Sequence, residues 1–286
     1  MSIKDTLVIK AGKWEAGANP RLGANTVYLK YDGKDILCPL ESEEQLQANP
    51  YIQGAPILLP ANRTYLGKFS FEGKDYTLPI TESRTNSHLH GTVHRQCFEL
   101  LSATETAVVM KYSNTGATYP FDFDITVTYE IDEGGFSQRY EITNTGKCNM
   151  PFTFCLHSTF VEPECFILPI CSRQEDVRDI PTGRYIPLSE QERRYVTGSP
   201  SKGIYVVGYF EASGNVATVG RFDYEVSKNF DHWILYNARG ERGFLCLEPQ
   251  AGKVNGLNMD GGSIILAPGK TEVFTTRYSL SPNPAE

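Results

Sequence analysis

The chain has 286 residues, of which 40% are hydrophobic and 12% aromatic, and its 34 acidic and 27 basic side chains give a net charge of −7. This hydrophobic content is enough for a substantial core. The acidic balance disfavours nucleic acid and anionic membranes as partners, because binding phosphates requires clustered Lys and Arg. No stretch is long and apolar enough to span a membrane, and residues 1–5 lack the apolar run of a signal peptide. We therefore expect a cytoplasmic protein.

Alternating apolar and polar residues dominate the chain from its beginning. Residues 25–31 and 34–37 flank an Asp32-Gly33 turn, and residues 69–78 contain a second hairpin that turns at Glu72-Gly73. Further strand-like runs, rich in β-branched and aromatic residues, cover 107–112, 124–131, 138–144, 203–210 and 273–280.

Two segments interrupt this pattern. Residues 171–202 are polar and irregular, which indicates an insertion loop. Within them, residues 188–195 are compatible with a short helix that Ser189 caps. We predict an all-β fold, a large antiparallel β-sandwich, with residues 1–286 forming a single domain.

The seven cysteines, at positions 38, 97, 148, 155, 165, 171 and 246, form no CxxC pair. Cys155 and Cys246 lie in apolar runs, where cysteine behaves as a small buried hydrophobe. We interpret all seven as reduced, structural thiols, in keeping with a cytoplasmic location.

Glu248 ends an apolar strand-like run. Phe244 and Cys246 share its face, while Leu245 and Leu247 point the other way. Partial desolvation there would raise the pKa of the carboxyl group toward that of an effective general base. The alternative is an exposed or ion-paired glutamate at a strand end.

Two histidines are further candidates for acid/base chemistry. His157 shares a strand face with Thr153 and Cys155, which fits the wall of a polar pocket, although a core histidine is the alternative. His90 precedes Gly91, which allows close approach to the backbone. His88 and His90, with His94 nearby, also resemble a cupin-like metal site, but the glutamate expected after the pair is missing.

Arg63 and Asp231 complete a set of five polar positions. The guanidinium group of Arg63, which follows Asn62, is a rigid fork of donors suited to adjacent hydroxyl groups or a ring oxygen. Asp231 precedes His232, interpreted as structural, and Trp233. Tyr65, Trp233 and Tyr236 are candidates for an aromatic stacking surface.

This ordered set of residues resembles the aldose 1-epimerase (galactose mutarotase-like) family over about residues 20 to 280. The local match is incomplete: Ser158-Thr159-Phe160 follows His157 where many mutarotases have Pro and an aromatic residue, and Thr92 stands where many relatives have a second glycine. The resemblance implies the galactose mutarotase-like supersandwich and a cofactor-independent, metal-free isomerase that interconverts the α and β anomers of a free aldose.

The resemblance also implies a role for each residue. Glu248 would be the base and His157 the acid at the ring oxygen, with His90 hydrogen-bonding nearby. The substrate-binding residues would be Arg63, Asp231 and Trp233. The expected partner is a small-molecule sugar, and the expected state is a monomer or homodimer.

Other functions stay open at this point. A hexose-6-phosphate 1-epimerase would need additional cations, for which Arg84 and Arg95 are candidates. A non-catalytic sugar-binding or sensing protein would not need a matched acid and base. A glycosidase is disfavoured, because hydrolysis uses two carboxyl groups and only one lies in a motif here.

Overall fold

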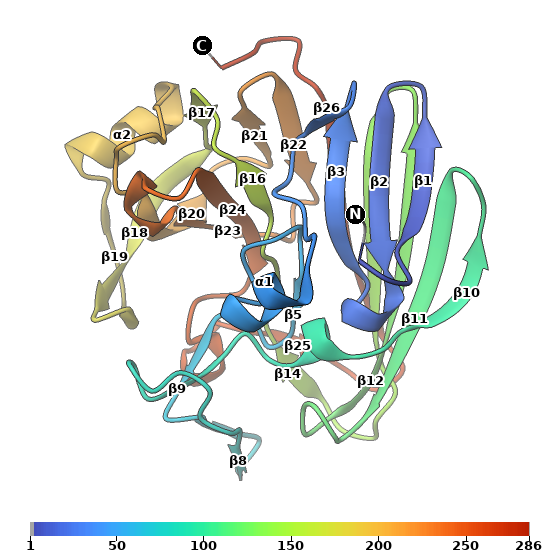
Figure 1. Cartoon of the computed structure of the whole chain (residues 1–286). Coiled ribbons are helices and arrows are strands. Elements are labelled where there is room, and N and C mark those ends of the chain that lie inside the picture. The colour runs from blue at the N-terminus through green and yellow to red at the C-terminus, as the bar shows by residue number, and fades with distance from the viewer. Residues whose placement is uncertain (1–2, 286) are drawn as a thin grey trace.

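Two large antiparallel sheets dominate the computed structural model, which describes residues 3–285 (Figure 1). The first sheet has eight strands in the order β10 (Glu99–Ala103), β11 (Ala107–Thr115), β12 (Asp122–Asp132), β13 (Gly135–Asn144), β26 (Thr271–Leu280), β22 (Phe222–Val226), β21 (Val216–Val219) and β17 (Phe166–Ile167). The second joins β19 (Ile180–Pro187), β18 (Ile170–Val177), β20 (Val207–Ala212), β23 (His232–Tyr236), β24 (Phe244–Ala251), β15 (Phe154–Leu156) and β5 (Ile57–Leu58), and β16 (Thr159–Val161) also pairs with β24.

Smaller sheets surround these two. One contains β1 (Leu7–Ala11), β2 (Trp14–Asn19), β3 (Asn25–Tyr31) and β4 (Lys34–Asp35). The remaining pairs are β6 (Arg63–Tyr65) with β9 (Ser87–Leu89), β7 (Lys68–Phe71) with β8 (Lys74–Thr77), and β14 (Met150–Phe152) with β25 (Ile264–Leu266). The predicted all-β, antiparallel sandwich is confirmed.

Aromatic side chains fill the space between the two large sheets. Trp233 of β23 lies with its ring 6.0 Å from that of Tyr224 of β22, and Phe154 of β15 stacks at 4.7 Å on Phe274 of β26. These residues belong to one contiguous cluster of buried apolar side chains. Because alternate residues of a strand face opposite sides, the side chains of His232 and Ile234 in β23 point to the other face of the second sheet.

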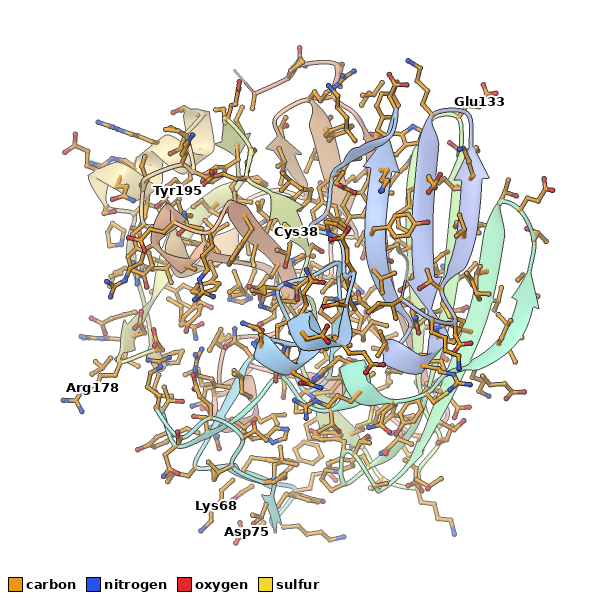
Figure 2. All side chains as sticks on the ribbon, in the orientation of Figure 1. Cys38, Lys68, Asp75, Glu133, Arg178 and Tyr195 are labelled. Atoms are coloured by element: carbon orange, nitrogen blue, oxygen red, sulfur yellow. The ribbon has the colours of Figure 1, made fainter. Side chains whose placement is uncertain are left out.

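The predicted turns and most of the predicted strands are confirmed. Asp32 and Gly33 both have positive φ and connect β3 to β4, and Glu72 and Gly73 do the same between β7 and β8. Figure 2 shows Lys68 and Asp75 of this second hairpin at the lower edge of the molecule.

The short helices begin at serine caps. Helix α2 (Glu190–Thr197) begins after Ser189, whose hydroxyl accepts from the Glu192 amide in a capping box, as the sequence predicts. Helix α1 (Glu43–Ala48) has the same kind of box at Ser42. It was not predicted, since six residues are too few to show a helical stripe. Single 3₁₀ turns are η1 (Pro20–Leu22), η2 (Val93–Arg95), η3 (Ala238–Gly240) and η4 (Gly256–Asn258).

The prediction of an irregular loop over residues 171–202 is wrong. Most of the segment forms the β18–β19 hairpin followed by α2. β19 is the edge strand of the second sheet and β18 pairs with it, and their solvated polar side chains hide the usual alternation. Arg178, at the turn between them, projects from the left edge of the molecule in Figure 2.

All seven cysteines are free thiols, and Cys155, Cys165 and Cys246 are buried. Cys38 is half-buried, and Cys97, Cys148 and Cys171 are exposed, so the interpretation as buried hydrophobes applies to three of them. Within residues 3–285, no helix has the length and apolarity needed to cross a membrane.

Candidate active site

Strands β20, β23 and β24 form the floor of a cavity of about 560 Å³. Their register places Tyr209, Ile234 and Glu248 in one row across the sheet. The next row, two residues along, contains Val207 and Tyr236. These five side chains line the cavity, on the face of the sheet opposite the core. Segments before β6 and around β9, together with residues 48–52, supply its walls.

Glu248 and His157 meet on this floor. His157 lies in the short interruption between β15 and β16. The hydrogen bond from Leu247 N to Ser158 O holds it across from Glu248. The His157 Nε2 atom is 3.3 Å from Glu248 Oε1, and the two residues are 5% and 2% exposed. The Cys155 thiol donates weakly to Glu248 Oε2 over 3.9 Å. We refer to His157 and Glu248 as the acid/base pair.

Burial shifts the pKa values of the two members in opposite directions. Desolvation raises the pKa of Glu248 to about 8, although the charge of Arg63 opposes the rise, and it lowers the pKa of His157 to about 4. Burial therefore favours the uncharged form of both groups, protonated Glu248 and deprotonated His157. Between them they would then hold one proton at neutral pH, with 3.3 Å between Nε2 and Oε1.

His90 lies next to this pair. Its backbone N–H donates to Asn62 O over 2.8 Å, and its φ of 64° turns the chain toward the cavity. Gly91 follows with a φ of 61°, and a Cβ there would lie 1.9 Å from Leu59 O, so the position requires glycine. The His90 ring centroid is 5.4 Å from that of His157. Desolvation lowers the pKa of His90, and its Nδ1 atom is buried without a partner.

Arg63 enters the cavity as part of a hydrogen-bonded cluster. Its guanidinium group donates twice to Glu82, at 2.9 and 3.0 Å, and also to the Tyr209 hydroxyl at 2.9 Å. Arg84 pairs with the same Glu82 at 3.2 Å and with Asp179. These four charged side chains all line the cavity, and their charges cancel.

Tyr51 was not predicted as a site residue. It follows α1, and its ring centroid lies 4.6 Å from that of His90 and 6.0 Å from that of His157. Glu82 and Tyr209 were missed as well. Only the alternation in Tyr205-Val206-Val207-Gly208-Tyr209 could have indicated a tyrosine-bearing strand face.

The structure places Asp231 and Trp233 outside the cavity. The side chain of Asp231 is 57% exposed, accepting from the Gly252 amide and contacting His232 Nδ1 at 2.7 Å. Trp233 is buried in the core because the phase of β23 turns it toward the first sheet. The expectation that these two side chains face a sugar in this cavity is therefore not met.

Of the remaining predicted residues, some line the cavity and others lie outside it. His232 is held between Asp231 and the Tyr185 hydroxyl, 2.6 Å from Nε2, consistent with a structural role. Of the other aromatic candidates, Tyr236 lines the cavity and Tyr65 does not.

The cupin-like arrangement of His88, His90 and His94 does not form. His88 Nδ1 donates to Pro79 O over 2.7 Å, and His94 Nε2 accepts from Arg95 in the wall of another cavity, of about 440 Å³. Within the described chain, the group of three potential ligand residues with atoms inside 4.8 Å of one another is His157, Cys246 and Glu248. It contains the acid/base pair, whose mutual contact accounts for the close spacing.

Comparison with known proteins identifies the family. The family model for aldose 1-epimerase matches residues 6–279. The chain belongs to the aldose 1-epimerase family. This confirms the resemblance inferred from the five polar positions.

Solved structures with the aldose 1-epimerase fold are similar along nearly the whole chain. A galactose mutarotase-like protein from Clostridium acetobutylicum is 22% identical with a TM-score of 0.89, covering 96% of this chain and 95% of that one. A putative aldose 1-epimerase from Escherichia coli K12 is 17% identical with a TM-score of 0.84, covering 96% and 98%. At these identities, the similarity shows the fold.

Curated relatives include the uncharacterized protein YihR of Escherichia coli K12. It is 25% identical over 173 residues, which cover 57% of this chain and 54% of YihR. The match therefore spans about half the length of that relative.

Proposed function

We propose that this aldose 1-epimerase family member interconverts the α and β anomers of an uncharged aldose. The observation that carries the proposal is the acid/base pair, buried on a cavity floor with 3.3 Å between Nε2 and Oε1. Anomer exchange needs one group that accepts a proton and one that donates a proton, and a pair with a single proton supplies both.

The proposed reaction begins with the sugar ring above the floor. Glu248 accepts the proton of the anomeric hydroxyl while His157, which has taken the proton of the pair, donates it to the ring oxygen. The C1–O5 bond then breaks and the anomeric oxygen becomes an aldehyde oxygen. After rotation about C1–C2, the ring oxygen attacks the opposite face of the aldehyde and both protons return. Nothing is oxidised or reduced.

The residues beside the pair are assigned supporting roles. His90 is neutral and lies against His157, so one of its ring nitrogens can donate to or accept from an oxygen near the anomeric centre. Arg63 favours the ionised form of Glu248 through its charge, and Tyr209 is placed in the same row of the floor to contact ring hydroxyls.

The charges around the cavity favour an uncharged sugar over a sugar phosphate. A phosphate-binding site would need cations that are not already neutralised. Both arginines that line the cavity are paired with carboxylates, Arg63 with Glu82 and Arg84 with Glu82 and Asp179. Arg95, the other predicted phosphate ligand, lines the separate cavity beside His94.

The decisive experiment is an NMR-exchange or polarimetric screen of free and phosphorylated aldoses, with and without EDTA. We expect acceleration for at least one free aldose, unchanged by EDTA. Tight binding of a sugar without acceleration would favour the sensing protein, and exchange of phosphorylated sugars alone would favour a hexose-6-phosphate 1-epimerase.

A further inference from the structure

A second cavity, of about 440 Å³, lies beside the candidate active site. Pro50 lines both cavities. The ring centroid of Tyr51 is 4.6 Å from that of His90 and 6.0 Å from that of His157, both of which line the active-site cavity. It is also 5.0 Å from the ring centroid of His94, which lines the second cavity. The Tyr51 ring therefore lies between the two cavities and separates them.

The walls of the second cavity are partly apolar and come from separate segments of the chain. Four of the eight lining residues are apolar: Leu22 of η1, Leu46 of α1, Pro50 and Pro56. The buried Asn25 satisfies its side-chain amide within the protein, because it donates to Gln53 O over 3.4 Å and accepts from the Ala55 amide over 2.9 Å. The volume lies within the range of small-ligand sites, about 300–1,000 Å³, and the apolar walls favour a ligand that buries an apolar group.

Arg95 supplies the charge of this cavity, since no aspartate or glutamate lines it. Its side chain forms no salt bridge with a carboxylate of residues 3–285, whereas Arg63 and Arg84 of the active-site cavity are both paired. Its Nε atom donates to His94 Nε2 over 3.1 Å, so the two Nη groups remain as donors. Desolvation raises the pKa of the Tyr51 hydroxyl, and the charge of Arg95 opposes this rise. That hydroxyl is therefore neutral and leaves the charge of Arg95 uncompensated.

A carboxylate with an apolar body matches this combination of groups. A guanidinium group binds a carboxylate through two parallel hydrogen bonds. Burial lowers the pKa of His94 to about 3, so its ring is uncharged and the cavity carries a single positive charge, which one carboxylate neutralises. Inorganic phosphate would bind Arg95 but leave the apolar walls without contact, and an uncharged sugar would leave the charge without a partner.

We propose that the second cavity is a binding site for a small monocarboxylate, whose carboxylate group pairs with Arg95 and whose aromatic or branched aliphatic body packs against Leu22, Leu46 and Pro56. The site is separate from the acid/base pair and takes a ligand of a different chemical class from the sugar proposed there. Its occupation is measured by binding alone, so the test does not depend on the proposed epimerase function.

The test is an NMR titration of the full chain with benzoate, phenylacetate and 3-methylbutanoate. The comparison probes are benzamide, which has the ring of benzoate without its charge, and inorganic phosphate, which has charge without an apolar body. We expect at least one carboxylate to bind about tenfold more tightly than either. Arg95→Gln should weaken its binding about tenfold, and Arg95→Lys, which keeps the charge, should weaken it less. Arg21→Gln is the matched control, because Arg21 is close in sequence to the cavity wall but pairs with Asp5 at 3.0 Å and does not line the cavity.

Two further variants locate the bound probe. Leu46→Ala should weaken carboxylate binding and leave phosphate binding unchanged, and Glu248→Gln should change neither, because Glu248 lines only the active-site cavity. The proposal is overturned if none of the three carboxylates binds, if Arg95→Gln binds them as the wild type does, or if phosphate or benzamide binds as tightly as they do. A loss in Glu248→Gln as large as that in Arg95→Gln would place the probe at the active site and overturn the proposal as well.

Discussion

Replacing Glu248 with glutamine removes the carboxyl group that we propose as the proton acceptor while keeping its shape. A single general acid or base contributes on the order of 10²–10⁴-fold to a rate. The loss should be about 10⁴-fold, because the proposed exchange needs both groups, which lie 3.3 Å apart. By the same reasoning, His157→Asn should be about as inactive, and the double variant little worse than either single variant.

The assay is NMR exchange between anomers at saturating sugar, with binding measured by titration. We expect Glu248→Gln to lower kcat while the dissociation constant changes little. Glu225→Gln serves as a control, since Glu225 is exposed on the first sheet and lines a different cavity. Near-normal exchange in Glu248→Gln, or losses that add fully in the double variant, would refute a pair that works as a unit.

Three further predictions follow from the site and its support. The rate of anomer exchange should show a bell-shaped pH dependence with limbs near pH 4 and pH 8. Below the first value the pair gains a second proton, and above the second it loses its only proton. An exchange rate that rises through pH 9 would contradict this. Glu82→Gln should lower the free energy of unfolding by about 1.5–3 kcal/mol and raise KM, as measured by urea denaturation and initial rates, since it releases Arg63. Gly91→Ala should destabilise the protein by several kcal/mol, because the strain at positive φ and the backbone clash add. The control Gly73→Ala, which has open space around it, should cost about 1 kcal/mol. Equal melting temperatures of the two variants would contradict the clash.

The sequence was most informative where local alternation decides the outcome. The face shared by Cys246 and Glu248 and the burial expected of that carboxyl group are confirmed, because both follow from strand geometry and an apolar run. The motif at Asp231 and Trp233 predicted side chains in the cavity, but the structure places both outside it. The face that a β23 side chain takes depends on pairing with β20 and β24, which a local motif does not contain.

Long-range contacts explain the other differences. Glu82 reaches Arg63 because it bridges to Ser87 of β9, which pairs with β6, and no local pattern reveals this. The polar hairpin within 171–202 was missed because most side chains of β18 and β19 are polar and partly or fully exposed, so the strands lack the apolar alternation that marks a half-buried strand.

The buried acid/base pair also makes the folded state less stable than it would otherwise be. In the unfolded chain, Glu248 ionises near its ordinary pKa of 4.5, whereas in the fold it stays protonated up to about pH 8. As pH rises between these values, ionisation stabilises the unfolded state, and the free energy of unfolding falls by on the order of a few kcal/mol. Glu248→Gln does not ionise and avoids this penalty, so the inactive variant should be more resistant to urea than the wild type, by a margin that grows from pH 5 to pH 8. The chain would then keep the Glu248 carboxyl group although the fold would be more stable without it.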